Sequence, residues 1–452
     1  DGTNGSELWK TDGTGAGTAF VKDLELGVEG SGPTDFVELG GSIIFTAFTE
    51  TTGRELWRTD GTGPGTTMIT ELVDGVVSGI FSTNQTLFST GSMVLFQGDE
   101  GATGGGVPFG ELWKTDGTEP GTVLVKNINN SPTSSAPRAF VRGGSRVYFI
   151  ARDADHGAEI WVSDGTEAGT ELVKDLVPGT GSPLISGFAT VGDTLYFSQL
   201  GTEGTFELWK SDGTSGGTVF VKDIGGAMPF DTPDHFTALG NTLYFVTTTE
   251  ANGRELWKSN GTAAGTVIVK DIDQSGSSSP QQLTVAGNML FFTATNPDDG
   301  RELWRTNGTA NGTDLVKDIN PTGNDSEPLE LTPFRDDLYF TANDGINGRE
   351  LWKTNGSAAG TQLVLDIREG SGGSSPTGLV VIRNTVYFSA LTNAIGVELW
   401  RSNGSAATTE MVKDIAPGNA SSNPAELAAI NETVFFAASN GPDGVELWAA
   451  DV

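Results

Sequence analysis

The feature that most constrains this chain is a short phrase that returns at an almost constant interval. Residues 7–14 read ELWKTDGT, and close variants begin at nine later glutamates, the last of them opening ELWAADV at Glu446. Neighbouring tryptophans of the phrase are 48 residues apart, except for one gap of 56 residues and one of 47. Such a period is typical of repeat folds, in which each unit buries its hydrophobic face by stacking on its neighbours. The phrase holds all ten tryptophans of the 452-residue chain: Trp9, Trp57, Trp113, Trp161, Trp209, Trp257, Trp304, Trp352, Trp400 and Trp448.

Each repeat contains four short segments with the composition of β-strands. In residues 235–272 they are HFTAL, NTLYFVT, RELWKS and TVIVKDI, here named segments A to D. β-Branched and aromatic residues dominate segments B and D, and Gly, Asn or Asp separate the segments. No stretch shows helical periodicity. The sequence therefore predicts an all-β fold, a β-propeller of about nine four-stranded antiparallel blades.

The count of segments indicates how the ring closes. Nine A, nine B and nine D segments stand beside ten C segments, so N- and C-terminal strands would share one blade and one C segment would be left over. Nine blades exceed the usual range of about four to eight, so an open array or two smaller propellers remain alternatives. Because no linker divides the repeats, we predict a single domain over residues 1–452, with nine repeats of about 48 residues from Trp9 to Trp448. A start in mid-repeat suggests a segment of a longer protein.

The phrase itself predicts a β-hairpin. ELWKT is a strand and DGTGAGT the turn after it, because Asp–Gly accepts positive φ and an Asx side chain bonds nearby N–H groups. Metal binding is the alternative for these aspartates, although later repeats carry Asn, as at Asn260. The Trp supplies apolar area between blades. If the hairpin is centred on the turn, Glu7 lies opposite Lys22, and the same offset pairs Glu with Lys in six more repeats.

Composition restricts the partners. The chain has no Cys, which excludes disulfides and thiolate metal sites. Its 26 basic and 58 acidic residues give a formal net charge of −32, a field that repels nucleic acid and anionic lipid. No apolar run approaches the roughly 18 residues needed to span a bilayer. We therefore predict no nucleic-acid partner and no membrane insertion.

Few residues suggest chemistry. Asp153 and Asp155 stand in a D-x-D-x-G loop, a spacing that can supply oxygen ligands, so calcium is the candidate ion there, although no cofactor is required. The two histidines, His156 and His235, lie in different repeats and are expected to be ordinary loop or edge residues. The most divergent stretch is the insertion at residues 101–110, where we would first look for a ligand. No catalytic residue is assigned.

The phrase and its continuation, E-L-W-x-[ST]-[DN]-G-[TS] followed by G-T-x-[LF]-V-K-D-I, resemble the ELWxxDGT-repeat proteins of bacteria over essentially the whole chain. The resemblance implies a large secreted or surface-associated protein and no established activity. The turn is also similar to the Asp-box hairpin of sialidases and related propellers, without the aromatic that typically follows it. That box is structural and implies no catalysis.

These observations lead to a functional prediction. Near-uniform repeats present like residues, whereas catalysis needs unlike residues brought together. We predict a secreted or cell-surface, non-catalytic propeller that acts as a structural, adhesion or ligand-binding module for a glycan or surface protein. The alternative is a carbohydrate-active hydrolase or lyase that uses carboxylates at the propeller mouth. Self-assembly through the terminal strands is a third hypothesis.

Overall fold

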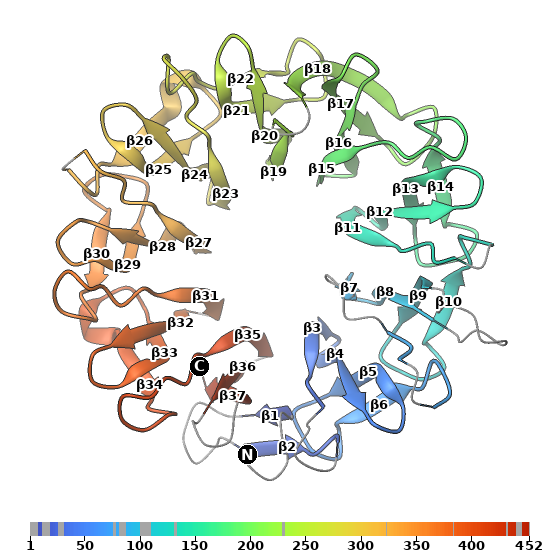
Figure 1. The fold of residues 1–452 in the computed structure, drawn as a ribbon, viewed down its shortest axis with the longest axis horizontal. Coiled ribbons are helices and arrows are strands. Elements are labelled where there is room, and N and C mark those ends of the chain that lie inside the picture. The colour runs from blue at the N-terminus through green and yellow to red at the C-terminus, as the bar shows by residue number, and fades with distance from the viewer. Residues whose placement is uncertain are drawn as a thin grey trace.

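The computed structural model is a ring of β-sheets around a central axis (Figure 1). It describes residues 8–10, 19–25, 31–75, 78–80, 87–99, 110–130, 133–227, 231–321, 323–382, 384–430, 433–439 and 445–451. Eight antiparallel sheets have four strands, and consecutive strands along the chain are hydrogen-bonded neighbours in each. The predicted all-β propeller is confirmed.

The eight complete blades follow one another along the chain. Their strands are β3 (Thr34–Leu39), β4 (Ser42–Thr49), β5 (Gly53–Thr59) and β6 (Thr67–Thr70); β7 (Leu87–Ser89), β8 (Val94–Gly98), β9 (Glu111–Thr115) and β10 (Val123–Lys126); β11 (Arg138–Gly143), β12 (Arg146–Asp153), β13 (Gly157–Ser163) and β14 (Glu171–Lys174); β15 (Ile185–Val191), β16 (Thr194–Leu200), β17 (Thr205–Ser211) and β18 (Val219–Ala227); β19 (Asp234–Leu239), β20 (Thr242–Thr249), β21 (Gly253–Ser259) and β22 (Val267–Ile268); β23 (Gln281–Ala286), β24 (Met289–Asn296), β25 (Gly300–Thr306) and β26 (Thr313–Lys317); β27 (Leu329–Phe334), β28 (Asp337–Asn343), β29 (Arg349–Thr354) and β30 (Gln362–Leu365); β31 (Thr377–Ile382), β32 (Thr385–Thr392), β33 (Gly396–Ser402) and β34 (Glu410–Lys413). Single 3₁₀ turns, η1 (Ala310–Gly312) and η2 (Ala406–Thr408), lie between the last two strands of their blades.

Strands from both ends of the chain close the ring. The C-terminal strands β35 (Ala425–Ile430), β36 (Thr433–Ser439) and β37 (Val445–Asp451) form a three-stranded sheet. The N-terminal strands β1 (Leu8–Lys10) and β2 (Ala19–Lys22) form a two-stranded sheet, and β1 lies beside β37 (Figure 1). The surplus C segment is thus accommodated by two adjacent sheets rather than by one mixed blade.

The blades are held together by apolar side chains from facing sheets. On one blade, Ile44 and Leu56 are fully buried and face the next blade, where Phe96 and Trp113 pack against them. The alternation of side chains along a strand provides both faces, because Phe45 of the same strand packs toward the preceding blade. Five tryptophans of the phrase are buried at such interfaces: Trp57, Trp113, Trp161, Trp304 and Trp352. The large rings therefore act as packing elements between blades.

The turn of the phrase is built from its own side chains. Asp60 Oδ1 accepts hydrogen bonds from the backbone N and the Oγ1 of Thr62, at 2.8 and 2.7 Å. In a later repeat Asn260 Oδ1 accepts the same two bonds from Thr262, at 3.1 and 2.7 Å. A single side-chain oxygen accepts both bonds and needs no charge, so Asp and Asn can replace each other at this position. A role in the turn therefore explains why some repeats carry Asp and others Asn.

The predicted pairing of Glu with Lys is wrong by one residue. A bulge between Leu303 and Trp304 places Lys317 opposite Leu303 rather than Glu302. The Lys317 Nζ donates instead to the carbonyl of Thr361 in the next blade, at 3.0 Å. The same bond joins five other pairs of blades, from Lys22, Lys126, Lys174, Lys222 and Lys270. This lysine therefore links neighbouring blades through a hydrogen bond, a contact called here the lysine tie.

Candidate functional site at the inner strands

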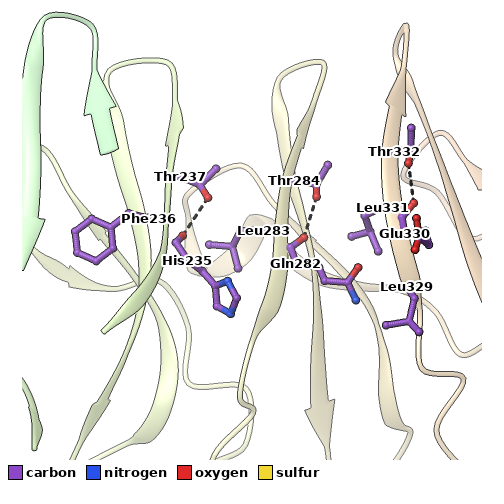
Figure 2. A pocket seen from close by; sticks show the side chains of 10 residues that line it. All are labelled: His235, Phe236, Thr237, Gln282, Leu283, Thr284, Leu329, Glu330, Leu331 and Thr332. Atoms are coloured by element: carbon purple, nitrogen blue, oxygen red, sulfur yellow. Dashed lines mark hydrogen bonds between the residues drawn. The ribbon is translucent and has the colours of Figure 1, made fainter. Parts of the chain in front are cut away.

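The first strand of each blade lies on the inside of the ring, nearest the central axis (Figure 1). A pocket of about 530 Å³ spans three of these strands, β19, β23 and β27. Its lining is His235, Phe236, Thr237, Gln282, Leu283, Thr284, Leu329, Glu330, Leu331 and Thr332 (Figure 2). A volume of this size lies within the usual range of ligand pockets, about 300 to 1,000 Å³.

A bulge near the start of each of these strands shapes the pocket. The bulged residues are His235, Gln282 and Glu330, with φ of 55°, 54° and 58°. Left-handed backbone costs a non-glycine residue roughly 1 kcal/mol or more. The equivalent bulges of two other blades carry glycine, Gly187 and Gly378. Two further blades carry a side chain at the same bulge, Asp35 and Ala139, with φ of 59° and 56°, so the strained backbone belongs to the scaffold and the side chain varies from blade to blade.

Each bulge is fixed by a threonine two residues later. Thr237 Oγ1 donates to the carbonyl of His235 at 3.0 Å, and Thr284 Oγ1 donates to that of Gln282 at 2.9 Å. Thr332 Oγ1 makes the matching bond to Glu330 at 2.8 Å. Figure 2 shows the three threonines in corresponding places on neighbouring strands. The scaffold repeats, while the side chain that it presents changes from imidazole to amide to carboxylate.

Contacts between blades position the polar groups. Gln282 Nε2 donates to the carbonyl of Pro328 at 3.0 Å, and Glu330 Oε2 accepts a bond from the backbone N of Leu379 at 3.4 Å. Next to His235, the carboxylate of Asp234 forms an ion pair with Arg254 at 2.5 Å. Among the described residues, the structure gives Glu330 no cationic partner.

The residues singled out in the sequence lie elsewhere, except for His235. Asp153 Oδ1 accepts bonds from the backbone N of Asp155 and His156, at 3.0 and 2.6 Å, and its Oδ2 lies 2.7 Å from His156 Nδ1. This bond raises the pKa of His156. Asp155 is exposed. Within the described ranges, no group of three or more His, Asp or Glu side chains is arranged to hold a metal ion. Calcium at Asp153 and Asp155 stays a prediction.

Two further predictions from the sequence concern the insertion and His235. Residues 101–109 of the insertion, the first place proposed for a ligand, lie outside the described residues. His235 was expected to be an ordinary edge residue, yet it lines the pocket. A signal was present: each of these three strands follows a proline, and the residue two places after Pro233, Pro280 and Pro328 differs each time. When the residue at one position differs from repeat to repeat, packing between the repeats does not determine its identity, and such positions can carry a binding surface.

Comparison with known proteins identifies the fold but no family. No family model and no curated protein matches the sequence. A Mycobacterium tuberculosis puromycin-hydrolyzing peptidase is 12% identical over 90% of this chain and 58% of its own, with a TM-score of 0.42. The Pyrococcus horikoshii acylaminoacyl peptidase is 10% identical over 77% of this chain and 56% of its own, with a TM-score of 0.36. The β-propeller domain of the Pyrococcus furiosus trilobed protease is 10% identical over 73% of this chain and 96% of its own, with a TM-score of 0.36.

At these identities the likeness shows the fold alone. The chain spans little more than half the length of the two peptidases, and the likeness is to a propeller rather than to a catalytic domain. No helix in the described part of the chain has the length and apolarity of a membrane span.

The predicted function requires correction. Several of the similar structures are named as peptidases, rather than as surface, adhesion or carbohydrate-active proteins. The prediction rested on repeats that mostly present like residues, and the pocket departs from that premise because it brings three unlike side chains to equivalent places. Both the surface module and its carbohydrate-active alternative are therefore withdrawn.

Proposed function

We propose that this chain is the propeller of a peptidase-type protein and that it admits and holds extended peptide segments at the inner strands of its ring. One observation carries the proposal: the pocket lies across β19, β23 and β27, each of which is an edge strand of its sheet. An edge strand leaves one row of backbone N–H and C=O groups unpaired. Extended peptides bind such edges through main-chain bonds, and pockets beside the edge select their side chains.

The composition of the pocket supports the same proposal. Phe236, Leu283 and Leu331 are partly buried against the blade cores and supply apolar surface, while the bulged residues supply polar groups. Polar groups placed beside apolar side chains are typical of sites that orient a flexible ligand. The resemblance to ELWxxDGT-repeat proteins and a secreted or surface location stay predictions beside this proposal.

Peptide binding can be tested with a pair of matched glycine variants. Gln282→Gly removes the central side chain of the pocket and relieves the strain of its left-handed backbone. Asp35→Gly relieves the same backbone strain at the equivalent bulge of β3, where φ is 59°, but leaves the pocket unchanged. We expect labelled, unstructured peptides to bind the wild-type chain and the Asp35→Gly variant alike in fluorescence anisotropy. Gln282→Gly should weaken binding by about tenfold, the loss of one hydrogen-bonding side chain. No peptide binding, or equal losses in both variants, would refute the proposal.

A further inference from the structure

The hydrogen-bonding character of the pocket indicates which peptide side chain it takes. Three threonine hydroxyls, those of Thr237, Thr284 and Thr332, donate their hydrogens to the carbonyls of the bulged residues. Toward the pocket these hydroxyls therefore present only acceptor lone pairs. One amide hydrogen of Gln282 is donated to the carbonyl of Pro328, the second stays available as a donor, and the amide oxygen is an acceptor. Acceptors therefore predominate among the polar side chains of the lining, and the donors are the ring N–H of His235 and the second amide hydrogen of Gln282.

The charge of the pocket has the same sign. Glu330 is half-buried, and its carboxylate has no cationic partner among the described residues. The neighbouring Asp234 is neutralised by Arg254 at 2.5 Å. The acid at the equivalent bulge of β3 differs, because Asp35 Oδ2 accepts bonds from Thr34 and Thr46 within its own blade, at 3.2 and 3.4 Å. Of these bulge acids, Glu330 is the one placed to meet a cation from outside.

We propose that the pocket across β19, β23 and β27 selects a basic peptide side chain, lysine or arginine, with Glu330 as its anionic contact. This inference rests on the proposed peptide function. An ammonium or guanidinium is rich in donors and has no acceptor, so it complements a lining in which acceptors predominate. Its aliphatic stem can lie on Leu283, Leu331 and the exposed Leu329, as long basic side chains do on apolar surfaces.

The test uses peptides that differ in charge but not in shape. An arginine peptide and its citrulline counterpart, the neutral isostere, are titrated against the wild type, Glu330→Gln and the control Asp35→Asn. We expect the wild type and Asp35→Asn to bind the arginine peptide at least about tenfold more tightly, the typical contribution of a charged hydrogen bond. Glu330→Gln should bind both peptides equally, with its thermal unfolding unchanged.

The outcomes separate this inference from the proposed function. Equal binding of both peptides by the wild type would overturn the basic preference and leave the proposed peptide function intact. A preference for arginine that persists in Glu330→Gln would also overturn it, because the overall charge of −32 would then be the cause. If spermidine binds and depends on Glu330 while no peptide binds, the cation pocket is supported and the peptide function fails. Binding of neither spermidine nor peptide would overturn both.

Discussion

At the scale of single residues, the glycine of the repeated turn meets two demands. Gly308 has a φ of 88°, and its N–H donates to Thr306 Oγ1 at 2.9 Å. A Cβ at this position would lie 2.2 Å from the hydroxyl oxygen of Tyr244 in the preceding blade. Tyr244 is itself buried. The turn glycine is therefore required both by its backbone and by the adjacent blade.

These demands can be separated by mutation. We expect Gly308→Ala to lower the free energy of unfolding by about 3 kcal/mol or more, since overpacking adds to the left-handed backbone. Gly370→Ala should cost only about 1 kcal/mol, because Gly370 has a φ of 95° and open space around it. Urea unfolding followed by tryptophan fluorescence measures both. Adding Tyr244→Phe to Gly308→Ala should restore part of the loss, and failure to do so would exclude the clash with the hydroxyl.

At the scale of elements, a lysine on the outer strand links one blade to the next at six places in the described part of the ring. Lys317 bonds to the Thr361 carbonyl and lies 5.7 Å from the ring centre of Trp352, so it combines a hydrogen bond with a cation–π contact. The following blade has Leu365 at the equivalent register position, opposite Leu351. The interface after the blade of Lys317 therefore contains this lysine contact, and the interface after the blade of Leu365 lacks it.

This difference allows removal and addition of the same contact. Lys317→Met keeps the aliphatic stem but removes the charge and donors, and should destabilise the fold by about 1 to 2 kcal/mol. Leu365→Lys should gain a smaller amount, about 0.5 kcal/mol, by reaching the next blade. Differential scanning calorimetry compares both variants with the wild type. Equal stability of Lys317→Met and the wild type would show that the tie contributes nothing.

The elements also show what the sequence could and could not predict. Period, strand composition and turn residues identify the blades, because these properties are local and repeat nine times. The Glu–Lys register failed because a bulge at Leu303 adds one residue that no local pattern reveals. His235, Gln282 and Glu330 were missed as a group for another reason: they come together only when blades stack, and their left-handed backbone has no composition signal.

At the scale of the whole molecule, the first residue of the phrase produces a set of buried carboxyls. Glu302 is fully buried and accepts bonds from the backbone N of Ile319 and Ser326, at 3.2 and 3.0 Å. Burial raises the pKa of Glu302 to about 7, against the lowering effect of these bonds. Seven copies are buried and have a raised pKa: Glu55, Glu111, Glu159, Glu255, Glu302, Glu350 and Glu398. Every copy joins the third strand of its blade to the loop that leads to the next.

These carboxyls should make the ring more stable in mild acid than in mild base. The folded pKa of each lies above the unfolded value of 4.5, so the native state binds more protons. For Glu55, Glu159 and Glu302, whose pKa is raised to about 7, stability declines as pH rises from about 4.5 through about 7. Between pH 5.5 and pH 8, a carboxyl with a pKa of about 7 should lose roughly 2 kcal/mol of stabilisation. The turn aspartates, such as Asp60, have a lowered pKa and oppose this trend only in stronger acid, below about 4.

Chemical unfolding at several pH values, with Glu302→Gln as the matched variant, tests this coupling. Gln cannot ionise, and its NH₂ group cannot accept the bond from Ile319 or Ser326, so the variant should be less stable than the wild type at pH 5.5. Its deficit should shrink by roughly 2 kcal/mol at pH 8, where the wild-type carboxyl has become a buried anion. A deficit that stays constant or grows with pH would mean that Glu302 is already ionised in the native ring and that its backbone donors outweigh its burial.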